Sequence, residues 1–285
     1  MLDTRIVTFS FLLAFIVGCG SKPAAPSAND PKNGPTLPGK TDSTNAPDSK
    51  TLAQKQVSDF LIAVKDRKAT ADALTPEFKR AIAEPVFDAD REKGYSDAAA
   101  TQWLQNLAPN VGNTEARIDF IGSTLAFAVA PGKNGGRAVV RLARNGSGWK
   151  VDWFHIATKT LPDVDLSGNE DDAGAKFTSV AFVDSLLRRD YIEAESLMTT
   201  SSKASLAPPF SSDKARGYSR AILKTKLESF GGNRERWTIV GTSREGATIQ
   251  VNGAFQSGEM KTPFVLTLAK GTRPGDWLIE KFELK

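Results

Sequence analysis

The sequence predicts an α+β protein built from two tandem repeats, and three observations support this fold class. The segment FDADREKGYS at residues 87–96 returns as FSSDKARGYS at residues 210–219. Each copy lies in a longer matching stretch, and in each stretch helical periodicity comes first and strand periodicity last. We therefore predict repeats at 51–158 and 174–285, each with three N-terminal helices packed on a curved, cone-like antiparallel sheet of four or more strands.

The first half of each repeat has the apolar spacing of a helix. Apolar residues recur at i, i+3, i+4 and i+7, which places them on one helical face. These residues are Val57, Phe60, Leu61 and Val64 in the first repeat, and Phe177, Val180, Val183 and Leu187 in the second. Thr75 and Pro76 are typical of an N-cap and a first helical residue, so a second helix is expected there. A third helix is expected to start at Ser96 and at Ser219.

The second half of each repeat has the two-residue period of strands. The strand-like segments are RIDFIG, TLAFAVA, RAVVRLA and WKVDWFHI in the first repeat, and WTIVG, ATIQVNG, TPFVLTLA and WLIEKFEL in the second. Asn145 and Gly146 predict a hairpin turn between two of them. Short strands joined by tight turns favour an antiparallel meander.

The repeated ten-residue segment is interpreted as a helix-start motif with a structural role. Its residues are Phe87, Asp90, Gly94, Tyr95 and Ser96 in the first repeat, and Phe210, Asp213, Gly217, Tyr218 and Ser219 in the second. The serine is expected to cap the third helix, the tyrosine to pack on its first turn, and the glycine to allow a positive φ. The phenylalanine is expected to anchor the loop in the core, and the aspartate to bond nearby backbone N–H groups.

The N-terminus combines a short apolar run with a cysteine. Residues 6–17 have the length of a secretory h-region and are shorter than the roughly 20 apolar residues that a spanning helix needs. The following Gly18 and Cys19 complete a segment, IVGC, that resembles the lipobox of bacterial lipoproteins. The resemblance implies a signal peptide at 1–18, cleavage between Gly18 and Cys19, and lipid on Cys19. The alternative is an ordinary signal peptide with an incidental cysteine.

This resemblance implies a location in the bacterial cell envelope, anchored to a membrane by lipid, with the folded part on the non-cytoplasmic side. Residues 19–50 are rich in Pro, Ser and Asn and predict a disordered tether. Residues 159–173 are acidic and predict a linker between the repeats. The two repeats are free to pack against each other if that linker allows it.

The amino-acid composition limits the kinds of site that the protein can contain. The chain has one His and one Cys, which removes most cysteine, zinc and Ser-His-Asp chemistry, so no cofactor and no metal are expected. The formal net charge of +4 is too small for the concentrated basic face of a nucleic-acid-binding protein. The expected partners are the membrane, through Cys19, and either a small apolar ligand or an envelope protein.

The element order and the first-helix pattern VSDFLIAVKDRKATADALTPEFK resemble the nuclear transport factor 2-like fold, also called cystatin-like α+β. The resemblance covers both repeats and implies helices on a curved sheet that encloses a pocket. In that fold a short strand lies between the second and third helices, which the Pro-x-Phe segment would have to supply at Pro85–Phe87 and Pro208–Phe210. The fold serves isomerases, dehydratases and non-catalytic modules, so it does not select a function.

Three residues are candidates for acid–base chemistry. Asp90 and Asp213 have the residue type that the resemblance implies for a base, but they lie in a loop before a helix. His155 is the only histidine and lies in the strand WKVDWFHI, where alternation places Trp149, Val151, Trp153 and His155 on one face. A strand histidine with satisfied ring nitrogens is the structural alternative. A perturbed pKa at His155 would favour a catalytic role.

Cations recur in the helix-start motif. Arg91 and Lys93 in the first copy correspond to Lys214 and Arg216 in the second. Two cations in the same loop are able to contact an anionic lipid or glycan, and a solvated loop is the alternative.

The sequence favours a lipid-anchored, non-catalytic module that binds a ligand or a protein. A pocket acid–base enzyme of the isomerase or dehydratase type, using an Asp or His in one cone, is the second hypothesis. The third is a structural or assembly factor that acts through the sheet surfaces.

Overall fold

The computed structural model describes residues 48–285 except 86, 158–163, 233 and 273–274. The predicted signal peptide, Cys19 and the tether up to residue 47 lie outside the described residues. Pro47–Lys285 forms one compact unit with a hydrophobic core of its own. Among the described residues, no helix is long and apolar enough to cross a membrane.

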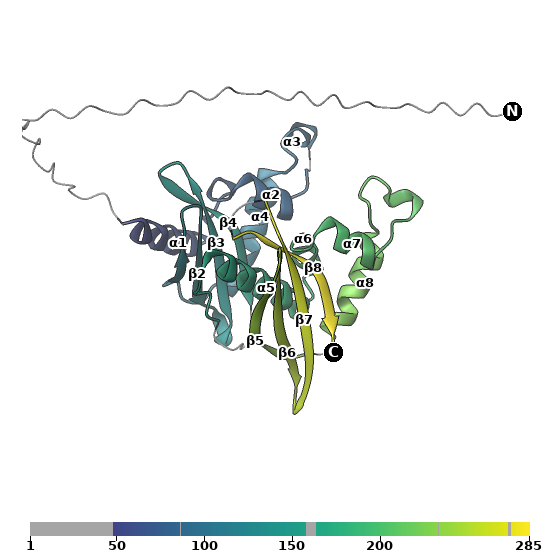
Figure 1. Ribbon diagram of the computed structural model, residues 1–285. Helices are drawn as coiled ribbons and strands as arrows, with labels where there is room; N and C mark the ends of the chain where they lie inside the picture. The colour runs from purple at the N-terminus through teal and green to yellow at the C-terminus, as the bar shows by residue number, and fades with distance from the viewer. Residues whose placement is uncertain (1–47, 86, 158–163, 233, 273–274) are drawn as a thin grey trace, which may run out of the picture. The chain divides into compact units, whose positions relative to one another are not determined.

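The predicted α+β class is confirmed, because helices precede a four-stranded antiparallel sheet in each half of the unit (Figure 1). The first half contains α1 (Ser49–Lys65), η1 (Ala71–Ala73), α2 (Pro76–Ile82), α3 (Asp88–Arg91), α4 (Asp97–Leu107), η2 (Ala108–Asn110), β1 (Arg117–Ile121), β2 (Leu125–Pro131), η3 (Lys133–Gly135), β3 (Arg137–Asn145) and β4 (Gly148–Ala157). Helix α1 thus begins inside the last two residues predicted for the tether.

The second half repeats this order. It contains α5 (Glu170–Arg188), α6 (Tyr191–Ser196), α7 (Thr200–Leu206), η4 (Ser211–Asp213), α8 (Arg220–Gly231), β5 (Arg236–Glu245), β6 (Thr248–Ser257), β7 (Met260–Lys270) and β8 (Trp277–Leu284). Local details repeat as well. Thr75 caps α2 and Thr199 caps α7 through their side chains. No strand forms at Pro208–Phe210, where the family resemblance requires one.

The acidic stretch predicted as a linker ends in a helix start. Helix α5 begins at Glu170, and the Asn169 side chain accepts a hydrogen bond from the Asp172 N–H at 2.9 Å. Acidic residues are stabilised in the first turn of a helix, where the helix dipole is positive. Much of the predicted linker acidity therefore belongs to the N-terminus of α5.

Helix α5 lies between the two sheets (Figure 1). It is buried on every side along most of its length. It serves as the core helix of the second repeat, and it also covers the back of the first sheet, where Phe177 lies 5.3 Å from Phe127 between ring centroids. The opposite face of the first sheet packs on α1 through Phe60 and Phe154 at 5.0 Å. Because each large apolar side chain contributes roughly 1.5–3 kcal/mol when buried, the two repeats stabilise each other.

Aromatic side chains pack inside each predicted cone. The rings are Phe60, Phe78, Trp103 and Phe154 in the first repeat, and Phe182, Phe230, Phe255, Phe264 and Phe282 in the second. Neighbouring centroids in the second set lie as close as 4.7 Å. Protein side chains thus occupy these spaces.

A β-bulge in β4 changes the predicted facing of its residues. Arg141 pairs with Trp153, but the next residue of β3, Leu142, pairs with Val151, so one residue of β4 is extra. Paired residues share a face, and successive residues of β3 alternate. Val151 therefore faces α1, whereas Trp153 and His155 face α5. The prediction that Trp149, Val151, Trp153 and His155 share one face is wrong, because the alternation breaks at the bulge.

Candidate functional site

The helix-start motif forms the same turn in both repeats. Gly94 and Gly217 have φ values of 76° and 79°. The Gly94 N–H donates to the Asp90 carbonyl at 2.9 Å, and Gly217 bonds Asp213 in the same way at 3.1 Å. The tyrosine of each motif lies beneath a lysine, with Lys79 at 5.1 Å from the Tyr95 ring and Lys203 at 5.3 Å from the Tyr218 ring. The same contacts therefore hold the base of the loop in both repeats.

The two copies differ in their caps. Ser96 accepts a hydrogen bond from the Ala99 N–H at 3.2 Å, as an N-cap does. Ser219 occupies the N-cap position of α8 but makes no such side-chain bond. Tyr218 donates its hydroxyl to Glu195 of α6. Burial, reinforced by Glu195, raises the pKa of Tyr218 to about 12.

The phenylalanines of the motif are exposed. Phe87 is 65% and Phe210 is 59% accessible, so the prediction that they anchor the loops in the core is wrong. The physical reason is that each phenylalanine is the N-cap of a short turn, α3 or η4, in a connection that stands out from the neighbouring helices (Figure 1).

The charged residues of the motif lie on these exposed loops. Asp213 accepts a long hydrogen bond, 3.4 Å, from the Phe210 N–H. Arg91 pairs with Asp88 at 3.1 Å and Lys93 with Asp97 at 3.8 Å. In the described part of the chain, Lys214 and Arg216 form no ion pair.

His155 lies in a buried polar cluster that joins the two repeats. Its Nδ1 is 2.8 Å from Glu193 Oε1 at α6, and its Nε2 is 3.4 Å from Asp184 Oδ2 on α5. Arg137 of β3 binds Asp184 at 3.1 Å, and Arg188 of α5 binds Glu193. We call these five residues the buried ion cluster.

Two tryptophans complete this cluster. Trp237 Nε1 donates to Asp184 at 2.7 Å, and Trp153 Nε1 donates to Glu193 at 3.3 Å. The carboxylates therefore receive hydrogen bonds from both repeats.

The charges of the buried ion cluster stabilise one another. Burial lowers the pKa of His155, but Glu193 and Asp184 outweigh burial and Arg188, so the pKa lies above its ordinary value. Burial raises the pKa of Asp184, yet Arg137 and His155 outweigh it and lower that pKa. Burial likewise raises the pKa of Glu193, and His155 and Arg188 lower it overall.

A buried imidazole ring held between two carboxylates cannot reach a substrate. The His155 side chain has no accessible surface, so the shifted pKa reflects an ion cluster that holds α5 and α6 against β4. Asp90 and Asp213, the other acid–base candidates, lie on exposed loops. The structure does not bring these three residues together.

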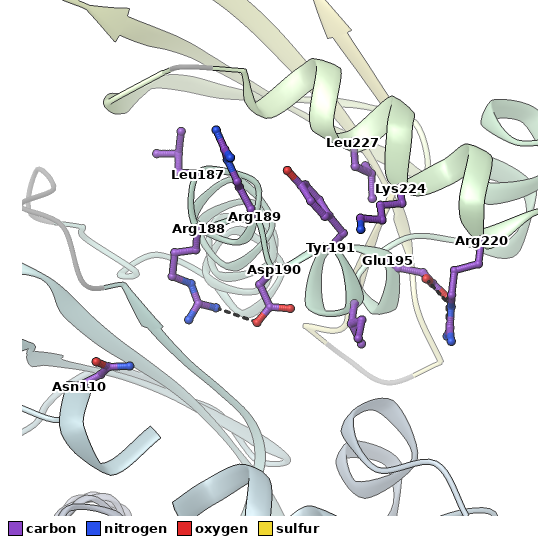
Figure 2. A pocket seen from close by; sticks show the side chains of 11 residues that line it. Asn110, Leu187, Arg188, Arg189, Asp190, Tyr191, Glu195, Arg220, Lys224 and Leu227 are labelled. Atoms are coloured by element: carbon purple, nitrogen blue, oxygen red, sulfur yellow. Dashed lines mark hydrogen bonds and ion pairs between the residues drawn. The ribbon is translucent and has the colours of Figure 1, made fainter. Parts of the chain in front are cut away.

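A groove of about 870 Å³ lies between the end of α5, α6 and α8, with Asn110 of η2 also at its wall. Figure 2 shows the lining side chains, among which the Tyr191 ring stands between Arg189 and Lys224. The lining residues are Asn110, Leu187, Arg188, Arg189, Asp190, Tyr191, Ile192, Glu195, Arg220, Lys224 and Leu227. We call this cavity the α5–α8 groove. Its size lies in the range of ligand sites.

Most cations of the groove are engaged by carboxylates. Arg188 binds Glu193 and lies 3.6 Å from Asp190. Arg220 binds Glu195 at 2.9 Å, and Lys224 lies 3.9 Å from a carboxylate on the next turn of α8.

Arg189 differs from these cations, because it forms no ion pair in the described part of the chain. Its φ is 62°, a left-handed conformation that costs a non-glycine residue roughly 1–2 kcal/mol. This conformation is that of the helix C-cap, since the Arg189 N–H bonds the carbonyls at the end of α5. The candidate contact for an anionic group is its exposed guanidinium beside the groove.

Apolar surface lines the same groove. Ile192 is 61% exposed at its rim, and Leu187 and Leu227 lie deeper. Burial and Glu228 raise the pKa of Tyr191, so its hydroxyl stays protonated as a hydrogen-bond donor. The groove thus offers apolar contacts, a phenol donor and one unpaired guanidinium.

The sheet surfaces are a poor match for the third hypothesis. Both faces of the first sheet are covered, as the full burial of the adjacent Val139 and Val140 shows. On the second sheet the outer face carries the pair of Gln250 with Thr267, and next to it Asn252 paired with the buried Val265. An exposed apolar patch is what marks an interaction sheet, and this face is polar.

Sequence reasoning missed the residues that build these two sites. Asp184 is the clearest example, because at the repeat offset it corresponds to Leu61, a buried core residue. An aspartate in the place of a core leucine signals a buried polar contact. Glu193 and Arg189 lie where the repeats diverge in sequence, so the alignment carried no signal for them.

Comparisons with known proteins give no family. No protein-family model matches the chain, and no curated protein matches it significantly. Among solved structures, the chain is similar to an "Ntf2 like protein involved in plasmid conjugation", with 11% sequence identity and a TM-score of 0.18 over 78% of this chain and 97% of that chain. A similarity this slight assigns neither a fold family nor a function to the chain.

Proposed function

We propose that the chain is a lipid-anchored envelope protein whose folded part is a non-catalytic binding module, with the α5–α8 groove as its binding site. The observation that carries this proposal is the groove itself, which combines a volume of about 870 Å³ with the unpaired guanidinium of Arg189. We also propose that the two repeats are nuclear transport factor 2-like units, which the repeated order of helices and four antiparallel strands supports.

The ligand proposed for the groove is a protein segment that carries an apolar side chain next to a carboxylate. Exposed Ile192 and the leucines behind it suit the apolar side chain, and Arg189 suits the carboxylate. Tyrosine and arginine are also the residue types that dominate protein–protein contacts. A small apolar ligand would favour an enclosed, mostly apolar pocket, and the charged lining of the groove disfavours it.

The acid–base alternative receives less support from the geometry. An enzyme of that type needs a carboxylate or imidazole that faces a cavity beside a hydrogen-bond donor. His155 is locked inside the buried ion cluster, and Asp90 and Asp213 lie on projecting loops.

The anchor is proposed from the leader sequence. Cys19 is the only cysteine of the chain and follows Gly18 at the expected cleavage point. The chain from Cys19 to the start of α1 has an r.m.s. reach of roughly 30 Å as a flexible tether. The Cys19→Ser variant is expected to remain an unprocessed precursor that takes up no labelled fatty acid. Acylation of that variant would refute the anchor.

The binding site is tested by photo-crosslinking in the native host. A photoreactive amino acid at Ile192 is expected to form a product of one defined mass, whereas the same amino acid at Met260, which is 75% exposed on the hairpin between β6 and β7, forms none. Arg189→Gly is expected to abolish the product. Equal products at both positions, or none at Ile192, would reject the groove.

The repeat supplies a matched control. Arg67 lies one residue beyond the C-cap of α1, whereas Arg189 is itself the C-cap of α5, and the two have similar φ values of 58° and 62°. The Arg67→Gly variant removes the same kind of residue from the same kind of conformation away from the groove. It should leave the crosslink unchanged, so a loss in both variants would indicate a folding defect.

A further inference from the structure

The duplicated loops around Phe87 and Phe210 present an aromatic side chain to solvent twice. Each phenylalanine is about as exposed as the other, at 65% and 59%. A single exposed apolar residue needs no explanation, but the same residue exposed at the same place in two repeats calls for one. The α5–α8 groove does not include either of them.

The two loops that carry Phe87 and Phe210 have the same backbone structure. Both turns contain a glycine with positive φ and the same glycine-to-aspartate backbone bond. In both loops the serine N–H donates to the carbonyl of the C-cap residue of the preceding helix. Ser96 donates to Ala83 after α2 at 3.1 Å, and Ser219 donates to Ala207 after α7 at 2.9 Å. Figure 1 shows both loops, α3 and the segment between α7 and α8, standing out at the same edge of the unit.

We propose that Phe87 and Phe210 are a pair of membrane-contacting residues that insert into the lipid surface to which the chain is anchored. This inference rests on the proposed lipid anchor at Cys19. An aromatic ring is well suited to the interface between headgroups and acyl chains. Lys214 and Arg216, which form no ion pair in the described part of the chain, lie beside Phe210 and suit anionic headgroups.

The tether makes so small a contact effective. The tether proposed from the sequence has an r.m.s. reach of roughly 30 Å, and a short flexible link gives an effective concentration in the millimolar range. Two phenylalanines are too little to recruit a free protein, but they are enough to orient one that is already held at the surface. The contact would thus fix which face of the module, and hence which side of the groove, points away from the membrane.

The test uses the full mature chain on vesicles of phosphatidylcholine and phosphatidylglycerol that contain a lipid with a quencher in its acyl chains. A fluorescent amino acid is placed at Ala89 or Ser212, beside the two phenylalanines, and at Glu259 as a control on the exposed β6–β7 hairpin. Quenching by about half is expected at both loops and none at Glu259. Removing the anionic lipid should weaken quenching at Ser212 more than at Ala89, because Arg91 and Lys93 are already paired.

Substitutions separate insertion from mere proximity. Phe87→Ser with Phe210→Ser is expected to abolish quenching at both loops, and Met260→Ser, at an equally exposed residue, is expected to change nothing. These side chains are exposed, so the variants should fold normally. Loops that are quenched no more than Glu259, or quenching that survives the double substitution, would overturn the proposal.

Anchoring is measured separately, so the two proposals fail in different ways. Flotation of the vesicles and the mass of the N-terminal peptide report acylation of Cys19. If Cys19 is not acylated, its free thiol is coupled to a maleimide lipid, and the loops are tested on the chain tethered in that way. Flotation without loop quenching would refute the inference and leave the anchor standing.

Discussion

Replacing Asp184 with Asn tests whether the buried ion cluster holds the two repeats together. The Asp184 side chain has no accessible surface, and Arg137, its partner at 3.1 Å, has 7%. Asparagine keeps nearly the same shape and still accepts a hydrogen bond from Trp237, but it removes the negative charge. The substitution therefore leaves the Arg137 guanidinium buried beside a neutral group.

The expected loss of stability follows from that geometry. Two unit charges at 3.1 Å interact by about 5 kcal/mol at an effective dielectric constant of 20. Breaking a buried pair by removing one partner typically costs about 3–5 kcal/mol. We expect the free energy of unfolding to fall by about 3–5 kcal/mol, a large share of the roughly 5–15 kcal/mol typical of a folded protein.

Urea unfolding followed by tryptophan fluorescence measures this loss. The transition should stay single with an unchanged m-value, because α5 belongs to the cores of both repeats. The Asp88→Asn variant is a matched control, because its pair with Arg91 is exposed and such pairs contribute about 0–1 kcal/mol. A loss below about 1 kcal/mol for Asp184→Asn would refute the reasoning, since the cluster would then be no more stabilising than a surface pair.

Three further predictions concern other parts of the unit. The pKa of His155 is raised in the folded state, so its contribution to stability is complete below pH 6.5 and is lost as the pH rises through the folded-state pKa. The His155→Gln variant should therefore show a smaller decline of the unfolding free energy above pH 6.5 than the unchanged protein. Ser96→Ala should cost about 1 kcal/mol by urea unfolding and Ser219→Ala clearly less, because only Ser96 makes the capping bond; equal losses would contradict this. Gly174→Ala should lower the melting temperature, although alanine normally favours a helix, because the added Cβ would lie 1.9 Å from the Gly275 carbonyl oxygen; an unchanged melting temperature would show that this backbone yields easily.

The element order could be predicted because each signal was local. The helical spacing in VSDFLIAVKD and in its second copy gave α1 and α5, and the Thr75–Pro76 pair gave the start of α2. The strand segments matched β1 to β8, since a two-residue period and tight turns need no tertiary information. The repeat made the helix-face and strand predictions twice, whereas the Thr75–Pro76 signal occurs in the first copy alone.

The way the repeats pack on each other left a weaker sign in the sequence. Strand β2 reads LAFAVAP, with apolar residues on both faces, whereas β6 reads TIQVNGAFQS and alternates. A continuous apolar run is typical of a strand that is buried on both sides. That contrast pointed to an additional layer over the first sheet, although it did not identify α5 as that layer.

The predicted roles failed where they depended on the direction of a side chain. His155 was assigned to the wrong set of neighbours, because a bulge shifts the alternation of β4 by one residue. Phe87 and Phe210 were assigned to the core on residue type alone, and a loop that projects from its helices reverses that expectation. The motif that looked like a single structural device has a structural base and an exposed tip.

Differences between the two halves also bear on where the groove lies, because all of its lining residues except Asn110 belong to the second half. In the first repeat, the C-terminal end of α1 continues through apolar residues into its own core, with Leu61 where the second repeat has Asp184. In the second repeat, α5 packs against both sheets, and its polar contacts with the first repeat are those of Asp184 with Arg137 and of Arg188 with His155. Arg189 follows the last residue of α5 and lines the groove, and it forms no ion pair in the described part of the chain. The second half thus completes the core of the first through α5, and the two halves differ most at this junction, as Asp184 in the place of Leu61 shows.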